Sequence, residues 1–194
     1  MALRLFVAVD LSDEAKRALS GLLSRLKGLD SGVRWVAPEN LHVTLKFLGN
    51  VEEGKVEAIR GALSGALSGF KPFAIRLKGL GAFPSAKRPR VVWMGVEEGN
   101  EELSALARAV EVALERLGFP REGREFVAHV TLGRVKSRAS GGLLRFLERP
   151  EGIPEVRQEV REVVLMRSVL RPEGPEYTPL FKFPLGGRGA GREV

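Results

Sequence analysis

One tetrapeptide occurs twice in this sequence and constrains its fold more than any other feature. His-Val-Thr-Leu stands at residues 42–45 and again at residues 129–132, one copy in each half of the 194-residue chain. The chain has two histidines, and each begins one copy. If each position matches by chance about once in fifteen, three matches coincide roughly once in a few thousand cases. The sequence therefore indicates an internal duplication.

The alternation of polar and apolar residues predicts that both copies are β-strands. Successive side chains of a strand point to opposite faces, so one face of the first copy carries His42, Thr44 and Lys46. The other face carries only apolar residues, namely Leu41, Val43, Leu45 and Phe47. In the second copy His129 and Thr131 share a face in the same way. We expect the apolar faces to pack on helices and, if the two halves face each other, the imidazoles and hydroxyls to converge on a groove.

The remaining hydrophobic pattern predicts an α+β fold. Apolar residues at helical spacing predict helices over residues 13–27, 56–69, 101–117 and 143–147. Ser12 is the expected N-cap of the first helix, and Gly28 is its expected stop signal. Strands are expected over residues 3–9, 73–78, 91–96, 126–135, 160–170 and 178–185, and residues 34–48 are expected to form two extended pieces around Pro38–Asn40. Because the strands outnumber the helices and do not alternate strictly with them, we expect helices on one face of mostly antiparallel sheets.

The balance of charges favours a polyanionic partner. Lys and Arg number 31 against 24 Asp and Glu, which gives a net charge of +7. The absence of cysteine excludes disulfides, thiolate catalysis and Cys-based metal sites. The apolar run Leu5–Val9 is too short for a membrane span or a signal sequence, so we expect a cytoplasmic protein without membrane contact.

Two histidines that face two threonines suit the cleavage of a phosphodiester. In-line displacement needs a base on the attacking oxygen and an acid on the leaving oxygen. Since the histidine pKa lies near neutrality, one imidazole can be neutral while the other is protonated. Threonine hydroxyls can donate hydrogen bonds to the non-bridging oxygens, and the scheme needs no metal or other cofactor. A metal site would need carboxylates close to the histidines, and none stands at helical or strand spacing beside either one.

Several segments resemble one known family over residues 3–185. They are Arg4–Val9, Asn40–Gly49, Gly81–Pro84, Arg90–Trp93, His129–Arg134 and Gly174–Tyr177. With these segments the chain is similar to the two-histidine phosphoesterases, and within them to the RNA 2′,3′-cyclic phosphodiesterases that were once called 2′-5′ RNA ligases. The resemblance implies one two-lobed domain over residues 1–185, with pseudo-two-fold duplicated antiparallel sheets, helices on their outer faces and a central cleft. The Gly/Arg-rich residues 186–194 are expected to form a disordered tail.

The resemblance also implies roles for the repeated residues. His42 would be the proton donor and His129 the proton acceptor, while Thr44 and Thr131 would hold the phosphate. The expected reaction is metal-independent hydrolysis of a 2′,3′-cyclic phosphate end of RNA to a 2′-phosphate. Two alternatives stay open, namely ATP-independent 2′-5′ ligation by the same site and an RNA-binding module without turnover.

Three further residues are candidates for substrate binding. Arg134 follows the second motif and reaches the phosphate only if Gly133 bends or bulges the strand. Lys46 is expected on the same face as His42, where it could meet RNA phosphates. Tyr177 follows a Gly-Pro turn and could stack on a base. We expect a monomer with RNA as its partner.

Overall fold

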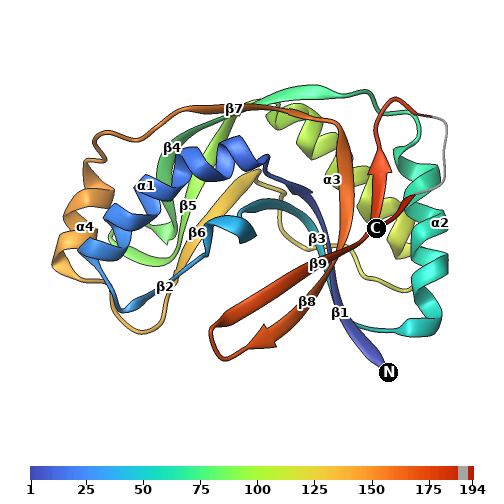
Figure 1. Cartoon of the computed structure of the whole chain (residues 1–194), viewed down its shortest axis with the longest axis horizontal. Coiled ribbons are helices and arrows are strands. Elements are labelled where there is room, and N and C mark those ends of the chain that lie inside the picture. The colour runs from blue at the N-terminus through green and yellow to red at the C-terminus, as the bar shows by residue number, and fades with distance from the viewer. Residues whose placement is uncertain (188–191) are drawn as a thin grey trace.

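A computed structural model gives the fold of the chain, and it describes residues 1–187 and 192–194 (Figure 1). The helices are α1 (Asp13–Leu29), α2 (Val56–Leu67), α3 (Asn100–Glu115) and α4 (Gly141–Glu148), with short 3-10 turns η1 (Pro38–Asn40) and η2 (Glu53–Lys55). The strands are β1 (Ala2–Asp10), β2 (Val33–Trp35), β3 (His42–Glu52), β4 (Phe73–Ser85), β5 (Arg88–Glu98), β6 (His129–Val135), β7 (Val156–Val160), β8 (Glu162–Arg171), β9 (Gly174–Pro184) and β10 (Arg192–Glu193). The predicted α+β class is confirmed.

The described strands form one sheet in the order β10-β9-β8-β1-β3-β6-β5-β4-β7, and β2 pairs with β6 beside this path. Each pairing is antiparallel. The strands that carry the repeated tetrapeptides, β3 and β6, are neighbours at the middle of the sheet. They join through one register pair, Val43 with Val130. The two copies of the repeated tetrapeptide therefore lie side by side at the centre of the sheet.

The helices form two pairs that cross between the halves of the chain. Helix α1 contacts α4, β2 and β7, whereas α3 contacts α2 and β3. Figure 1 shows α1 and α4 toward one end of the molecule and α2 and α3 toward the other. Helix α1 of the N-terminal half therefore packs on β7 of the second half, and α3 of the second half packs on β3, the strand of the first motif. This exchange ties the two halves together.

The two faces of the sheet carry different hydrophobic clusters. The larger cluster includes the motif residues Val43, Leu45, Val130 and Leu132 together with the buried residues of all four helices. A smaller, separate cluster consists of Phe6, Ala8, Val164 and Met166, with Tyr177 packed against it. We call the helix-covered side the core face. The side that carries His42, Thr44, His129 and Thr131 is called the histidine face.

The ends of α1 show what local signals predict and what they miss. The Ser12 hydroxyl accepts a hydrogen bond from the Ala15 amide, so the predicted N-cap is confirmed. The prediction of Gly28 as the stop is wrong, because the helix continues to Leu29 and ends at Asp30. The Asp30 carboxylate accepts the backbone amide of Ser140, at a distance of 2.6 Å, and this partner lies 110 residues away.

Several strand boundaries also differ from the prediction, among them those of β4, β5, β8 and β9. The second motif strand begins at His129 rather than at residue 126. In the predicted tail, residues 188–191 lie outside the described residues, whereas Arg192 and Glu193 pair with β9. Within the described ranges no helix is long and apolar enough to cross a membrane.

Candidate active site

The two imidazoles are held by the same backbone device. Nδ1 of His42 lies 2.6 Å from the carbonyl oxygen of Asn40, and Nδ1 of His129 lies 2.7 Å from that of Val127. A carbonyl oxygen can only accept, so each Nδ1 carries the proton and donates it. In the neutral ring Nε2 is then unprotonated. Each histidine therefore offers Nε2 as its reactive nitrogen.

The threonines of the motifs lie on the same face as the histidines. Nε2 of His42 is 2.9 Å from the Thr44 hydroxyl oxygen. Thr131 lies two residues after His129 on β6, which keeps it on the same side of the strand. The charge of His129 also lowers the pKa of His42. The structure thus brings the four predicted catalytic residues together around the junction of β3 and β6.

Burial sets the protonation of both rings. Desolvation lowers the pKa of His42 below its ordinary value of 6.5, against a smaller opposing effect of the Asn40 carbonyl. Desolvation also lowers the pKa of His129. Among the smaller charge effects, Asp10 raises the pKa of His42 while Lys16 and His129 lower it, and Arg134 lowers the pKa of His129. The carboxylate favours the imidazolium form at His42, and the guanidinium favours the neutral form at His129.

Aromatic rings enclose each histidine. The ring centroid of Phe6 lies 5.0 Å from that of His42, and Phe83 meets His129 edge-on at 5.2 Å. Trp93 lies 6.3 Å from His129. These rings withdraw the imidazoles from water, which explains why desolvation dominates both pKa shifts.

Tyr177, predicted as a base-stacking residue, lies against the first histidine. Its ring meets His42 edge-on at 5.4 Å, and it packs on Phe6 at 4.9 Å. Burial raises the pKa of its hydroxyl, so the group stays protonated and can donate a hydrogen bond. The side-chain amide of Asn40 donates a hydrogen bond to the carbonyl oxygen of Pro175, at 2.8 Å. This bond joins β9, the strand of Tyr177, to the turn before His42.

The prediction that Lys46 lies on the face of His42 is wrong. In the pairing of β1 with β3, Ala8 stands opposite Thr44 and Val7 opposite Lys46, so Leu45 is an extra, unpaired residue. Such a β-bulge interrupts the alternation of side chains. Lys46 therefore joins Leu45 on the core face.

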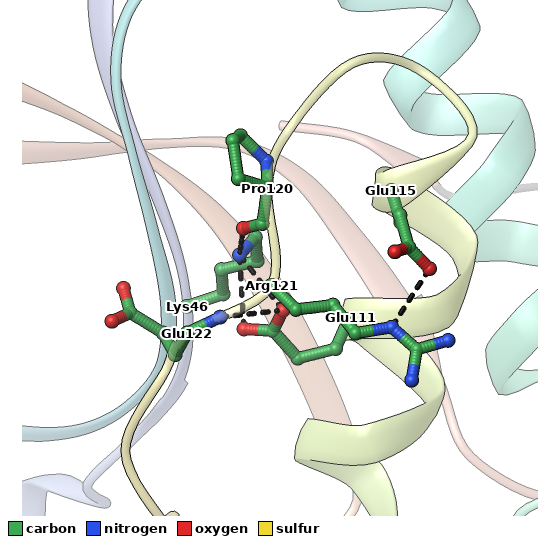
Figure 2. Close-up of polar contacts among 6 residues, drawn as sticks. All are labelled: Lys46, Glu111, Glu115, Pro120, Arg121 and Glu122. Atoms are coloured by element: carbon green, nitrogen blue, oxygen red, sulfur yellow. Dashed lines mark hydrogen bonds and ion pairs between the residues drawn. The ribbon is translucent and has the colours of Figure 1, made fainter.

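Lys46 is held there by a buried set of polar partners (Figure 2). Its side chain is 2% exposed, and its amino group donates to the Glu111 carboxylate at 2.9 and 3.0 Å and to the Pro120 carbonyl at 2.8 Å. The same carboxylate accepts the amide of Glu122. Glu111 belongs to α3, while Pro120 and Glu122 belong to the loop that leads to His129. Lys46 therefore joins the strand of the first histidine to the segment that precedes the second.

The bulge condition for Arg134 is met. In the pairing of β5 with β6, Trp93 stands opposite Thr131 and Val92 opposite Gly133, so Leu132 is the extra residue. Arg134 is exposed, and its charge lowers the pKa values of both His129 and Tyr177. These two effects put its guanidinium within electrostatic reach of the histidine face.

Sequence reasoning missed the groups that orient the site. The carbonyl oxygens of Asn40 and Val127 carry no side-chain signature, so nothing in the composition marks them. Phe6 was available as an aromatic residue of a predicted strand, but its strand partners were needed to put it beside His42. Phe83 was predicted in a loop of residues 83–90, whereas the structure extends β4 to Ser85 and so brings Phe83 beside His129. Phe47 was assigned to the core face, yet the bulge turns it outward and leaves it 57% exposed.

The described residues hold no group of three or more His, Cys, Asp or Glu side chains that could bind a metal ion. What the site offers chemically is two imidazoles with free Nε2 atoms, two hydroxyls and a nearby guanidinium. This set can move protons at two oxygens of a phosphodiester and donate hydrogen bonds to the others.

Comparison with known proteins agrees with this chemistry. A sequence model of the family described as LigT-like phosphoesterases matches the chain twice, over residues 9–93 and over residues 94–177. The chain belongs to the LigT-like phosphoesterase family. The two matches divide this phosphoesterase into halves that each carry one His-x-Thr motif.

Related proteins cover nearly the whole length of this phosphoesterase. A protein of Archaeoglobus fulgidus named RNA 2′,3′-cyclic phosphodiesterase is 44% identical over 181 residues, which are 93% of this chain and 99% of the relative. A protein of the same name from Methanothermobacter thermautotrophicus is 40% identical over 186 residues, which are 95% and 100% of the two chains. The resemblance to the RNA 2′,3′-cyclic phosphodiesterase family is thus confirmed.

Solved structures show the same fold. A crystal structure from Thermus thermophilus has a TM-score of 0.79 and 31% identity, and it covers 96% of this chain and 100% of its own. The crystal structure of Escherichia coli LigT complexed with 3′-AMP has a TM-score of 0.77 and 28% identity, with the same coverage.

Proposed function

We propose that this phosphoesterase hydrolyses the 2′,3′-cyclic phosphate at the end of an RNA to a 2′-phosphate, without a metal. The observation that carries the proposal is the matched orientation of two imidazoles, each with Nδ1 bound to a backbone carbonyl and with Nε2 left for chemistry. The names of the relatives support the substrate class.

In the proposed reaction His129 is the base. Its Nε2 takes a proton from water while the water oxygen attacks phosphorus. Arg134 supports this role, because its charge lowers the pKa of His129 and keeps the ring neutral.

His42 is the proposed acid. As the bond between phosphorus and O3′ breaks, Nε2–H of His42 gives its proton to O3′, which leaves a 3′-hydroxyl and a 2′-phosphate. Burial lowers the pKa of His42 in the free enzyme and Lys16 adds to this, while the Asn40 carbonyl and the Asp10 carboxylate raise the pKa. The negative charge of the bound phosphodiester also raises the pKa of His42.

The threonines are proposed to hold the phosphate. Their hydroxyls would donate to the non-bridging oxygens, on which negative charge develops during attack. Arg134 would add a charged donor to the same oxygens. The enzyme is proposed to act as a monomer in the cytoplasm.

The position of the phosphate in the product tests this proposal. An oligonucleotide with a 2′,3′-cyclic end is incubated with the enzyme, and the product is digested and analysed for a 2′- or 3′-phosphate. A 2′-phosphate is expected. A 3′-phosphate contradicts the assignment of acid and base, and a 2′-5′-linked product in the presence of a 5′-hydroxyl oligonucleotide supports ligation instead. No turnover of any cyclic phosphate supports the RNA-binding module.

A further inference from the structure

Two arginines stand directly opposite each other on the sheet. Arg34 of β2 is the register partner of Arg134 of β6, and both are exposed. Directly opposed residues of an antiparallel pair have Cβ atoms about 5 Å apart, and like charges in this position destabilise the sheet. Neither arginine forms an ion pair with a carboxylate among the residues that the structure describes.

Packing on the core face prevents Arg34 from turning away. Its neighbours Val33 and Trp35 point to the core face, where the Trp35 ring lies directly over Gly133. The Trp35 indole nitrogen donates to the carbonyl of Asp30 at 2.7 Å. Because the side chains of a strand alternate, Arg34 must then project from the same face as Arg134.

The chain segments that carry and flank this arginine pair contain positive charges alone. The segments 31–38, 84–96 and 133–147 hold no Asp or Glu, although they contain Lys87, Arg88, Arg90, Lys136 and Arg138. Val91, the residue after Arg90, pairs with Arg134 from the other side of β6.

Some exposed arginines elsewhere in the described chain have acidic partners. Arg157 pairs with Glu98, and Arg171 pairs with Glu176. The missing counter-charge at the end of β6 must therefore come from solvent ions or from a ligand.

We propose that Arg34 binds the internucleotide phosphate that precedes the cyclic end of the RNA. This inference rests on the proposed function. Arg134 acts electrostatically on His129 and is proposed to bind the reacting phosphate, and Arg34 lies one strand beyond it. An RNA chain whose terminal phosphate meets His42 and His129 then extends toward the end of β6, where the next phosphate bridges to the Arg34 guanidinium. The site would thus distinguish an oligonucleotide end from a free cyclic mononucleotide.

Three substrates and two variants test this assignment. The substrates are 2′,3′-cyclic AMP, the dinucleotide ApA with a 2′,3′-cyclic end, and the same dinucleotide with a neutral methylphosphonate linkage. The variants are Arg34→Ala and, as a matched control, Arg17→Ala, which removes an exposed arginine from the solvent side of α1. Arg34→Lys keeps the charge but loses the planar fork. Thermal melting of each variant verifies that it is folded.

For the charged dinucleotide, Arg34→Ala is expected to lower kcat/KM about tenfold and to reduce the slope of log kcat/KM against log salt by about one. For 2′,3′-cyclic AMP and for the neutral dinucleotide the same variant should match the wild type. On the charged dinucleotide, kcat/KM of Arg34→Lys should lie between the values of the wild type and of Arg34→Ala. Arg17→Ala should leave kcat/KM unchanged on all three substrates.

An equal loss on all three substrates would overturn the proposal, as would wild-type activity of Arg34→Ala on the charged dinucleotide. Wild-type hydrolysis of 2′,3′-cyclic AMP in the same assay tests the proposed function separately. If the wild type cleaves none of the three substrates, the proposed function fails. If it cleaves them and Arg34→Ala behaves as the wild type, only the role of Arg34 fails.

Discussion

Val43 of β3 pairs with Val130 of β6, and this register pair is where the two repeated motifs meet. Both side chains are fully buried on the core face. Because the strands are antiparallel, His42 lies on the Thr131 side of the pair and Thr44 on the His129 side. The histidine of each motif therefore lies across from the threonine of the other motif. This arrangement suits a proposed acid and a proposed base that act on opposite sides of one phosphorus atom.

The duplication gives a symmetric pair of histidines in unsymmetric surroundings. Both motif strands bulge at the same position, at Leu45 and at Leu132. The residue that returns to the histidine face after the bulge is Phe47 in one strand and Arg134 in the other. One side of the site is thus apolar and the other cationic, which allows two chemically similar histidines to take different roles.

The first prediction concerns the two histidines. Replacing either His42 or His129 with Ala should lower kcat by about two to four orders of magnitude, the usual contribution of one acid–base group. The double variant should cost less than the product of the single effects, because the two groups act as a unit. Steady-state rates on a cyclic dinucleotide measure this, with Arg17→Ala as the control. A single histidine variant that keeps activity within about fivefold of the wild type contradicts the assignment.

The second prediction concerns pH. Burial lowers the pKa values of both histidines below 6.5 in the free enzyme. The base His129 must be neutral, so kcat/KM rises with pH through its pKa. The acid His42 must be protonated, so kcat/KM falls above its pKa. The bell-shaped profile of kcat/KM should therefore peak below pH 6.5, whereas kcat should peak at higher pH because the bound anion raises the pKa of His42.

Histidine variants assign the two limbs of this profile. His129→Ala should remove the acidic limb from its residual activity, and His42→Ala should remove the basic limb. Exchanged limbs would show that the roles are reversed. A profile of kcat/KM that still rises above neutral pH would show that neither ring titrates as the geometry requires.

The third prediction concerns metal. Activity should survive exhaustive treatment with EDTA, because in the proposed mechanism the two imidazoles transfer the protons and the hydroxyls donate the hydrogen bonds without a metal. Rates measured before and after dialysis against EDTA, with and without added Zn²⁺ or Mn²⁺, decide the point. Loss of activity that either ion restores would contradict the two-histidine mechanism.

The sequence predicted the site as far as strand periodicity holds. Alternation within His-Val-Thr-Leu assigns His42 and Thr44 to one face and Val43 to the other, as the structure has them. The alternation breaks one residue later. A bulge depends on the pairing with the neighbouring strand, so the inward turn of Lys46 and the outward turn of Phe47 could not be read from β3 alone.

Long-range contacts account for the other errors. Gly28 is a normal helix stop by local rules, yet α1 continues to Leu29 and ends at Asp30, whose carboxylate accepts a hydrogen bond from the distant Ser140 amide. The crossing of α1 and α3 between the halves is likewise decided by packing and not by propensity. The α+β fold class was predictable because it depends on the number and order of helices and strands. Hydrophobic periodicity indicates both.

The fourth prediction concerns the buried ion pair of Lys46. Lys46→Met leaves the Glu111 carboxylate and the Pro120 carbonyl without their donor, and it should lower the free energy of unfolding by about 3 kcal/mol. Replacing Lys46 and Glu111 together with Met should cost less than the two single changes combined, since no buried charge then lacks a partner. Urea denaturation measures all three.

A surface pair provides the matched control for this cycle. Lys182 and Glu162 are 3.9 Å apart and each is 43% exposed. Lys182→Met should therefore cost less than about 1 kcal/mol. If Lys46→Met costs no more than Lys182→Met, the cluster in Figure 2 does not contribute to the stability of the fold.

The last prediction concerns the close approach of β2 to β6. A Cβ atom at Gly133 would lie 2.4 Å from a ring carbon of Trp35, so Gly133→Ala must push the indole away and should destabilise the protein by about 1–3 kcal/mol. Gly61→Ala is the control. Gly61 lies inside α2 with nothing within 4 Å of the added atom, so the change should stabilise the protein by up to about 1 kcal/mol.

The opposite effects of Gly133→Ala and Gly61→Ala on stability separate the cost of close packing from the gain in helix propensity. The variant Trp35→Leu then tests whether the Trp35 ring is the group that the added Cβ atom meets. If the indole is the obstacle, Gly133→Ala should cost much less in the Trp35→Leu background than in the wild type. Because Trp35 also anchors the strand of Arg34, Gly133→Ala should lower the preference for the charged dinucleotide over 2′,3′-cyclic AMP. Wild-type stability of Gly133→Ala would show that β2 yields without cost, and that the opposed arginines are not held in place by the core face.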